Sequence, residues 1–422
     1  MRYLQLILLS LLLLLFASSS CEDRQQEKNE DPTENNQTPP GDSEAGTLPP
    51  VETGKPNTDY QPAFEGQTRI AGVKTTTAYE AEVIADNLSK PWAVTALPDG
   101  RIVITEKAGK LRIATLTGEV SDPIGGFPAV DDRNQGGLLD VAPAPDFENS
   151  RILFFSLAEK TNQGSLTAVG KGTLAADESS IENFEIIFRA IPYYDNSMHF
   201  GSRIVFDRDG NLFVSTGERS DLATRPKAQL LDNGYGKVIH ITPEGDPVPG
   251  NPFINTSDAL PEIYSYGHRN AQSLDIHPVT QELWLAEMGP RGGDELNLIK
   301  PGKNYGWATI TYGIEYSGGT IGEGITQKDG MEQPVYYWDP VLSPSGMAFY
   351  TSDEIPEWKN NLFIGGLSSQ HIARLVIKDN KVIGEERLLE SEKQRFRDVA
   401  DGPDGALYAV TDSGRLYRIG RK

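Results

Sequence analysis

The chain has 422 residues, with 39 Lys or Arg against 60 Asp or Glu, which gives a formal net charge of −21. Because a phosphate backbone is bound by a basic face, this charge argues against nucleic-acid binding. The single cysteine excludes a disulfide framework and a cysteine-ligated zinc or iron–sulfur site. The 42 Gly and 28 Pro favour a turn-rich fold over a helical one.

The first 21 residues have the composition of an export signal. Arg2 supplies a positive charge, and the apolar run over 4–17 that follows is too short to span a membrane. Three serines directly precede Cys21, which resembles a bacterial lipoprotein cleavage site. We expect a lipoprotein-type signal over 1–21 and a lipid on Cys21, which would anchor the protein at the cell envelope, in the periplasm or on the cell surface. Ordinary secretory cleavage is the alternative.

Residues 22–77 are of low complexity, rich in Pro, Thr, Asn and Gln, with 11 acidic and 5 basic side chains. Such a composition does not bury enough apolar surface to offset the loss of chain entropy. We therefore expect a disordered acidic linker that holds the following domain away from the membrane.

One short pattern recurs six times after residue 78: a turn, a polar residue, and then four or five apolar or β-branched residues. The strands that it predicts cover 101–105, 151–156, 211–215, 282–286, 361–365 and 406–410. Units of 45 to 79 residues with several strands each are typical of propeller blades. The pattern thus predicts an all-β fold over 78–422, a six-bladed β-propeller with four-stranded antiparallel blades. A two-sheet sandwich is the alternative.

Several polar segments lie next to these strands. His199 is followed closely by small residues just before the third repeated strand, and Glu218 follows that strand. If the two side chains meet at one mouth of the central channel, the carboxylate could orient the imidazole and tune its basicity. Otherwise they are a loop histidine and a surface glutamate.

The segment from Glu287 to Glu295 is rich in glycine and ends in Asp294-Glu295. Glycine and proline, at Gly289 and Pro290, leave backbone carbonyls accessible, and calcium takes its ligands from carbonyl and carboxylate oxygens. A calcium site is therefore plausible here, although the spacing is not that of an EF-hand.

Arginines are placed where they could hold anions. Arg269 lies in a polar turn before the fourth repeated strand, and Arg395 and Arg397 alternate near the C-terminus. In a strand, Arg395 and Arg397 would share one face and could bind one polyanion together. For each of these segments taken alone, a solvated surface is the default interpretation.

Taken together, the segments resemble the soluble pyrroloquinoline-quinone-dependent aldose and glucose dehydrogenases of the glucose/sorbosone dehydrogenase family. The resemblance runs from about 85 to 420. It rests on motifs in family order, namely Gln135–Leu139, His199–Arg203, Gly267–Asn270, Gly289–Glu295, Asn304–Trp307 and Arg395–Asp398. The Gly289–Glu295 segment looks closer to the aldose sugar dehydrogenase branch.

The resemblance implies an oxidoreductase that converts aldoses to lactones at C1, with pyrroloquinoline quinone and Ca²⁺ as cofactors. It implies that His199 is the general base, that Glu218 is its acidic partner, and that Arg269 stabilises charge on the reduced quinone. It implies cofactor contacts from Gln135, Arg269, Asn270, Arg395 and Arg397. It implies calcium ligands among Gly289, Pro290, Glu295 and Tyr305.

The chain departs from the family at one point. Glucose dehydrogenases of the family carry a cofactor-binding Lys after the repeated strand of the fifth blade, whereas this chain has no Lys there and reads Gly366-Leu367-Ser368-Ser369-Gln370-His371. The missing Lys keeps open a non-catalytic propeller that binds sugar or protein. A calcium-dependent sugar lactonase is a second alternative, against which Arg395 and Arg397 argue, because a lactonase needs no Arg pair for a cofactor. The expected partners are an aldose and an external electron acceptor, either a cytochrome or the quinone pool. The acidic charge would suit a basic cytochrome.

Overall fold

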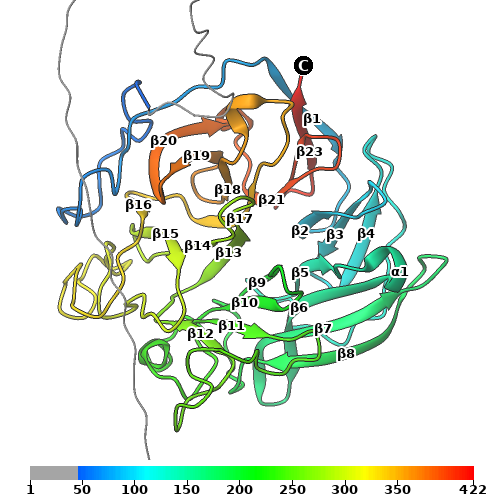
Figure 1. Ribbon diagram of the computed structural model, residues 1–422, viewed down its shortest axis with the longest axis horizontal. Coiled ribbons are helices and arrows are strands. Elements are labelled where there is room, and N and C mark those ends of the chain that lie inside the picture. Colours follow the sequence, from blue (N-terminus) through cyan, green and yellow to red (C-terminus); the bar gives the residue numbers. More distant parts are fainter. Residues whose placement is uncertain (1–45) are drawn as a thin grey trace, which may run out of the picture. The chain divides into compact units, whose positions relative to one another are not determined.

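The computed structural model describes residues 46–422, which form six antiparallel sheets around one axis (Figure 1). Blade 1 contains β2 (Pro91–Ala96), β3 (Ile102–Glu106) and β4 (Lys110–Ala114). Blade 2 contains β5 (Leu138–Pro143), β6 (Ile152–Thr161), β7 (Gly164–Leu174) and β8 (Ile181–Arg189). Blade 3 contains β9 (Gly201–Phe206), β10 (Leu212–Thr216), β11 (Lys237–Ile241) and β12 (Ile263–Tyr266).

Blade 4 contains β13 (Ala271–Ile276), β14 (Leu283–Glu287), β15 (Asp294–Ile299) and β16 (Tyr336–Trp338). Blade 5 contains β17 (Pro344–Phe349), β18 (Leu362–Gly366), β19 (Ile372–Lys378) and β20 (Lys381–Leu388). Blade 6 contains β21 (Phe396–Asp401), β22 (Leu407–Thr411), β23 (Leu416–Arg421) and β1 (Tyr79–Ala85). The helices in the described part are short, and they are α1 (Phe147–Ser150), η1 (Arg225–Gln229), η2 (Pro356–Trp358) and η3 (Glu390–Glu392).

The predicted six-bladed propeller is confirmed. The innermost strands β2, β5, β9, β13, β17 and β21 each contact the next, and β21 contacts β2, so the ring is closed. Blade 6 combines the last three strands with β1, which ties the two ends of the propeller together. Blade 1 has three regular strands, and within residues 46–422 its outer edge is extended by isolated bridges from Leu111 to Ile124 and from Ala114 to Val120.

The repeated sequence pattern corresponds to the second strand of every blade, namely β3, β6, β10, β14, β18 and β22. These strands are apolar almost throughout because both faces of each sheet are covered by the neighbouring blades. In β3, for example, Val103 packs into a cluster with blade 2, whereas Ile102 and Ile104 pack into a cluster with blade 6. The core therefore consists of apolar layers between successive blades.

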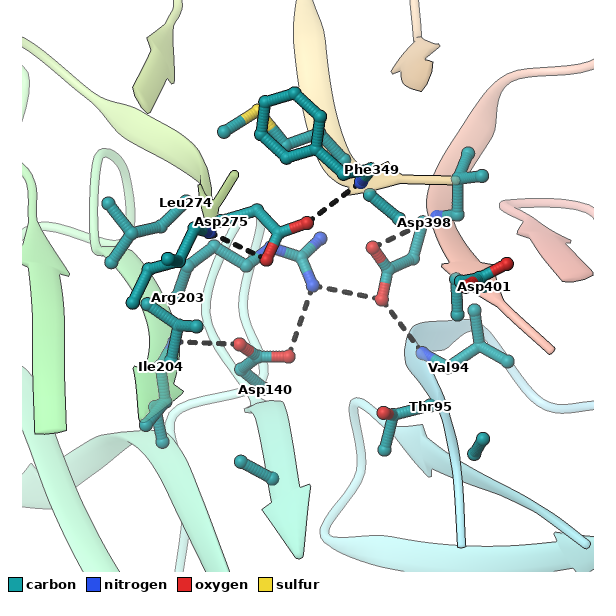
Figure 2. Close-up of a pocket in the computed structure, with 18 of the residues that line it drawn as sticks. Val94, Thr95, Asp140, Arg203, Ile204, Leu274, Asp275, Phe349, Asp398 and Asp401 are labelled. Carbon is teal, nitrogen blue, oxygen red and sulfur yellow. Dashed lines mark hydrogen bonds and ion pairs between the residues drawn. The ribbon is translucent and has the colours of Figure 1, made fainter. Parts of the chain in front are cut away.

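Buried charges join the innermost strands across the channel (Figure 2). Arg203 on β9 lies 3.1 Å from Asp140 on β5 and 2.9 Å from Asp398 on β21. Asp398 also accepts a hydrogen bond from the backbone N–H of Val94 on β2 at 2.8 Å. A cavity of about 350 Å³ lies against this cluster. These contacts connect four of the six blades.

Residues 46–77 correct the predicted linker, because they form an ordered segment that we call the N-terminal strap. Leu48 and Gly72 exchange backbone hydrogen bonds of 3.0 and 2.9 Å, and the N–H of Val73 donates to the carbonyl of Glu385 on β20. Further along, the carbonyl of Gln67 accepts from the N–H of Tyr337 on β16. Figure 1 shows the strap in blue beside β16 and β20.

The strap is ordered although its composition is polar, because its backbone pairs with the outer edges of blades 4 and 5. An unpaired strand edge is a ready template for another strand. Side chains add to the attachment: Gln67 is fully buried and donates to the carbonyl of Pro334, and Thr75 donates to Glu386. Composition alone gave no sign of these long-range partners.

The predicted signal over 1–21, the lipid site at Cys21 and the linker residues before 46 lie outside the described residues. Within the described part, no helix has the length and apolar character that crossing a membrane requires.

Candidate active site

Blade topology brings the predicted site residues to one end of the channel. In each blade the innermost strand begins where the second strand ends, because the two strands are antiparallel. Segments before or at the start of innermost strands carry Gln135, His199, Arg269, Asn270, Arg395 and Arg397. Segments after second strands carry Glu218 and the loop 288–293. The sheet of each blade thus delivers two loops to the same mouth.

His199 is held by two neighbours, Glu218 and Gln135. Its Nδ1 lies 2.7 Å from Oε1 of Glu218, and its backbone N–H donates to Oε1 of Gln135 at 2.8 Å. The second oxygen of Glu218 accepts from the N–H of Ser220 at 2.9 Å. A carboxylate at Nδ1 favours the tautomer that carries its proton there, which leaves Nε2 as the acceptor.

The backbone at His199 has φ of +50°, and the next residue but one, Gly201, has φ of +64°. Left-handed backbone is disfavoured for a residue with a side chain and is found disproportionately at functional sites. Gly201 is required, because a Cβ there would lie 2.5 Å from the carbonyl carbon of Thr216. The tight turn presents the imidazole to a cavity of about 360 Å³.

Burial governs the basicity of His199. Desolvation and the positive charge of Arg269 lower its pKa to about 4, and the hydrogen bond and charge of Glu218 offset only part of that shift. The imidazole is therefore neutral at pH 7 and ready to accept a proton.

Arg269 connects the histidine to the loop 288–293. Its guanidinium donates to the carbonyls of Met288 and Gly289 at 2.9 and 2.7 Å, and it lies 5.1 Å from the ring centroid of Trp307. Its Nε is buried without a hydrogen-bond partner in the described part of the chain. Arg269 lines the same cavity as His199, and its buried Nε is an unsatisfied donor.

Asn270 supports the site from behind. Its side chain is fully buried, its Oδ1 accepts from the N–H of Gly201 at 3.1 Å, and its Nδ2 contacts the sulfur of Met288. It does not line the cavity that contains His199 or the one beside it. The structure thus places Asn270 as a link between the histidine turn and the 288–293 loop.

The predicted calcium region contains an excess of buried acceptors. Glu287 and Glu295 both accept from Nδ2 of Asn297, at 3.2 and 3.3 Å, and the Oδ1 of Asn297 has no donor among the described residues. Burial, together with the nearby charge of Glu287, raises the pKa of Glu295 well above its usual value. A bound cation would give the Oδ1 of Asn297 a partner and would offset the repulsion between Glu287 and Glu295. The residues present therefore fit a cation.

The remaining predicted ligands differ in how they could contribute. The hydroxyl of Tyr305 donates to the carbonyl of Leu298 and its ring stacks on His268, so only its backbone carbonyl is a candidate. Gly289 and Pro290 both line the cavity of His199. Across residues 46–422, no three carboxylate, imidazole or thiol groups converge as a metal site, so carbonyl or amide oxygens are needed as well.

A second cavity, of about 570 Å³, contains the positive charges. Arg395 and Arg397 line it and share Asp412, at 2.7 and 2.8 Å. Lys90 and Lys107 line it too, and four cations against one carboxylate favour a ligand with several negative charges. The cavity shares several lining residues with that of His199, namely Gln135, Met198, Met288, Tyr316, Ser343 and Ser368. The two cavities therefore form one cleft.

Sequence reasoning missed Lys90, Lys107 and Asp412. Lys90 directly precedes β2, Lys107 follows β3, and Asp412 follows β22. Antiparallel strands bring the loop before each innermost strand and the loop after each second strand to the same mouth of the channel. This argument, already applied to His199 and Glu218, would have placed all three residues there. The segment 366–371, which lacks the family Lys, contributes Ser368 to the wall of the cleft. The hydroxyl of Ser343 donates to the hydroxyl of Ser368 at 2.8 Å.

Comparison with known proteins agrees with this geometry. A family model described as glucose/sorbosone dehydrogenase matches residues 88–418. The aldose sugar dehydrogenase YliI of Escherichia coli K12 is 45% identical over 343 residues, which cover 80% of this chain and 92% of that protein.

Two solved structures are similar as well. The soluble aldose sugar dehydrogenase of Escherichia coli in its apo form is 43% identical with a TM-score of 0.78, covering 82% of this chain and 100% of that one. The PQQ-bound aldose sugar dehydrogenase of Streptomyces coelicolor is 27% identical with a TM-score of 0.67, covering 82% of this chain and 99% of that one.

Proposed function

The chain belongs to the glucose/sorbosone dehydrogenase family, and from this premise we propose that it oxidises aldoses at C1 to lactones with pyrroloquinoline quinone as cofactor. The observation that carries the proposal is the cleft itself. A neutral, buried His199 paired with Glu218 stands in one part, and Arg395, Arg397, Lys90 and Lys107 stand in the other.

The protein's part in the reaction follows from the histidine. Nε2 of His199 accepts the proton of the C1 hydroxyl, and the carboxylate of Glu218 stabilises the imidazolium that forms. When bound, pyrroloquinoline quinone supplies the two-electron acceptor for the hydrogen on C1. The guanidinium of Arg269, which lines the cavity of His199, would stabilise negative charge that develops in the cleft.

The cofactor's carboxylates match the cations of the second cavity. Arg395 and Arg397 are held side by side by Asp412, so their forks are oriented before the ligand arrives. Lys90 and Lys107 take the place of the family Lys that is missing after β18. Gln135, held against the backbone of His199, lies where the two cavities join.

Calcium is the second proposed cofactor. Glu295, with Asn297 and the backbone oxygens near Gly289, Pro290 and Tyr305, would hold it, and it would act as a Lewis acid beside the cleft. The support is the orphan acceptor on Asn297 and the crowding of Glu287 and Glu295.

Reconstitution of the purified protein tests the proposal. We expect dye reduction with glucose that requires both pyrroloquinoline quinone and Ca²⁺ and is lost in His199→Gln. His277→Gln is the matched control, because His277 lies beside the cavity at the far end of the channel. Absence of turnover with any aldose when the quinone is bound would contradict the dehydrogenase assignment.

Export and anchoring are proposed separately, on the composition of residues 1–21 and the serines before Cys21. Mass spectrometry of the N-terminal peptide from membrane fractions should detect a diacylglyceryl-modified Cys21. Cys21→Ser should release the protein from the membrane, and release of the unaltered protein would contradict the anchor.

The physiological electron acceptor is proposed to be a basic cytochrome, because the chain carries a net charge of −21. Electrostatic steering of this kind weakens with ionic strength. Reoxidation by a basic cytochrome should therefore slow as salt is added, and an unchanged rate would contradict the proposal.

A further inference from the structure

Arg219 is a buried cation without an ion-pair partner. It directly follows Glu218, the partner of His199, and it is only 1% exposed. Burial lowers its pKa to about 10, so the guanidinium is still charged at pH 7. Among residues 46–422, no carboxylate forms an ion pair with it. Because an enclosed charge is costly unless its donors are satisfied, the groups around this guanidinium show what it holds.

The guanidinium contacts the chain on both sides of His199. Its Nε donates to the carbonyl of Met198 at 3.1 Å, and one terminal nitrogen donates to the carbonyl of Asn196. Its carbon atom lies over the ring of Phe200, 3.9 Å from the centroid. The residues directly before and directly after His199 are thus both held by one side chain.

The third carbonyl belongs to blade 2. The other terminal nitrogen of the guanidinium donates to the carbonyl of Ser165, near the start of β7, at 2.8 Å. From the same strand, the hydroxyl of Thr167 donates to the carbonyl of Phe200 at 2.6 Å. Ser165 also exchanges backbone hydrogen bonds of 3.0 and 3.1 Å with Tyr194. The guanidinium therefore fastens the turn that carries His199 to a strand of the neighbouring blade.

The backbone on both sides of this contact is held in a disfavoured conformation. Arg219 and Ser220 have φ of +73° and +54°, and His199 has φ of +50°. Residues with a Cβ adopt such angles at a cost in free energy, and they persist where surrounding contacts enforce them. The planar fork of an arginine suits this task, because its nitrogens point in fixed, different directions, whereas a lysine ammonium has a single nitrogen.

Arg219 lines neither the cavity of His199 nor the second cavity. It therefore contacts neither substrate nor cofactor in the proposed reaction, and its effect on catalysis passes through His199. We propose that Arg219 is a positioning residue, whose guanidinium holds the residues on either side of His199 and so directs Nε2 of the imidazole into the cleft. The inference rests on the proposed function and adds a residue that the reaction requires.

The first test uses the protein without cofactor. NMR shifts of the ring nitrogens report which of them carries the proton, and His199→Gln assigns the signal among the five histidines. We expect His199 to carry its proton on Nδ1, beside Glu218, and we expect Arg219→Met to move the shifts toward a mixture of tautomers. Arg374→Met is the matched control, because Arg374 in blade 5 is 2% exposed and also donates to a backbone carbonyl.

The second test is steady-state kinetics of the reconstituted enzyme, at a temperature at which every variant is folded. Because a small displacement of a reacting group is costly, Arg219→Met should lower kcat for glucose by about 10- to 100-fold, with little change in KM or in quinone affinity. Arg219→Lys should recover only part of this loss, since an ammonium lacks the fork. Arg374→Met should lower the melting temperature as Arg219→Met does, but leave kcat unchanged.

The outcomes are distinguishable. No turnover of any aldose by the unaltered protein would overturn the proposed function and the catalytic role of Arg219 with it. An unchanged kcat and unchanged His199 shifts in Arg219→Met would overturn the positioning role alone. An equal loss of kcat in Arg374→Met, or a loss of quinone affinity that accounts for the loss of activity, would show a general effect on the fold and would also overturn it.

Discussion

Nδ1 of His199 lies 2.7 Å from Oε1 of Glu218, and both side chains are buried. The carboxylate raises the basicity of the imidazole, while burial and Arg269 lower it by more, so the pKa settles at about 4. Glu218 therefore keeps the imidazole from becoming a still weaker base and favours the tautomer with its proton on Nδ1. In the proposed reaction its role is that of a positioning residue.

Glu218→Gln should lower kcat by about 10- to 100-fold, because the amide neither stabilises the imidazolium nor enforces the tautomer. The affinity for pyrroloquinoline quinone should be unchanged, since Glu218 does not line the second cavity, which contains Arg395 and Arg397. Steady-state kinetics and a quinone titration monitored by fluorescence check both statements. Glu282→Gln serves as a control, because Glu282 contacts Asn380 away from the site. A parallel loss of quinone affinity would contradict this reading.

The pH profile should reflect the depressed pKa of His199. The proposed base is active when neutral, and its folded pKa of about 4 lies below the ordinary 6.5. The limb of kcat/KM that reports this histidine should therefore stay flat from pH 8 down to about 5, and fall only as the pH approaches 4. A profile that halves near pH 6.5 would show that the base titrates as an exposed histidine.

Lys107 should contribute to cofactor affinity although no family motif contains it. Its ammonium donates to the carbonyl of Asn134, and burial, with the nearby charges of Arg397 and Lys90, lowers its pKa. Removing one cation beside a triply acidic ligand should weaken quinone binding about tenfold in Lys107→Ala. Titration of the apo protein with the quinone measures this. Lys303→Ala, at a half-exposed pair with Glu332, should bind as the unaltered protein does.

The fold was predictable because it repeats. The second strand of each blade is buried on both faces, so its sequence is a short apolar run after a turn, and six such runs are visible in the sequence. The pairing of His199 with Glu218 was predictable because antiparallel strands bring their flanking loops to one mouth. Lys107 could have been found by the same argument.

The strap was not predictable from composition, because its order depends on partners far along the chain. Asn57 is fixed by Asp339, and Gln67 by Pro334 and Tyr337, none of which leaves a local signal. The unpaired outer edges of blades 4 and 5 are themselves visible only after the blades are folded. The low apolar content of the strap indicated a disordered linker. The strap is ordered instead because the outer strand edges of blades 4 and 5 pair with its backbone.

Calcium should stabilise the protein through Glu295. Addition of Ca²⁺ to the metal-free protein should raise the melting temperature, and chelation should reverse the rise. Glu295→Gln should abolish the response, because it removes the carboxylate charge while keeping the side chain's shape. Differential scanning calorimetry with and without Ca²⁺ provides the measurement. A full response in the variant would place the ion elsewhere.

Arg203 should be a determinant of stability rather than activity. Its side chain is 5% exposed and forms ion pairs with both Asp140 and Asp398, so Arg203→Met leaves two buried carboxyl groups without their shared cation (Figure 2). Breaking a buried pair by removing one partner costs about 3–5 kcal/mol of unfolding free energy. Arg189→Met is the matched control, since Arg189 is 44% exposed in its pair with Glu159 and such pairs contribute about 1 kcal/mol or less.

The loss in Arg203→Met should depend on pH. Burial raises the pKa of Asp140 and Asp398 even beside the arginine, and removal of the arginine raises it further. The unfolded chain then releases these protons at a lower pH than the folded one, so the folded state is progressively disfavoured as the pH rises. Urea unfolding should therefore show a larger deficit at pH 8 than at pH 5. A deficit independent of pH would mean that the cost comes from lost packing on Trp92.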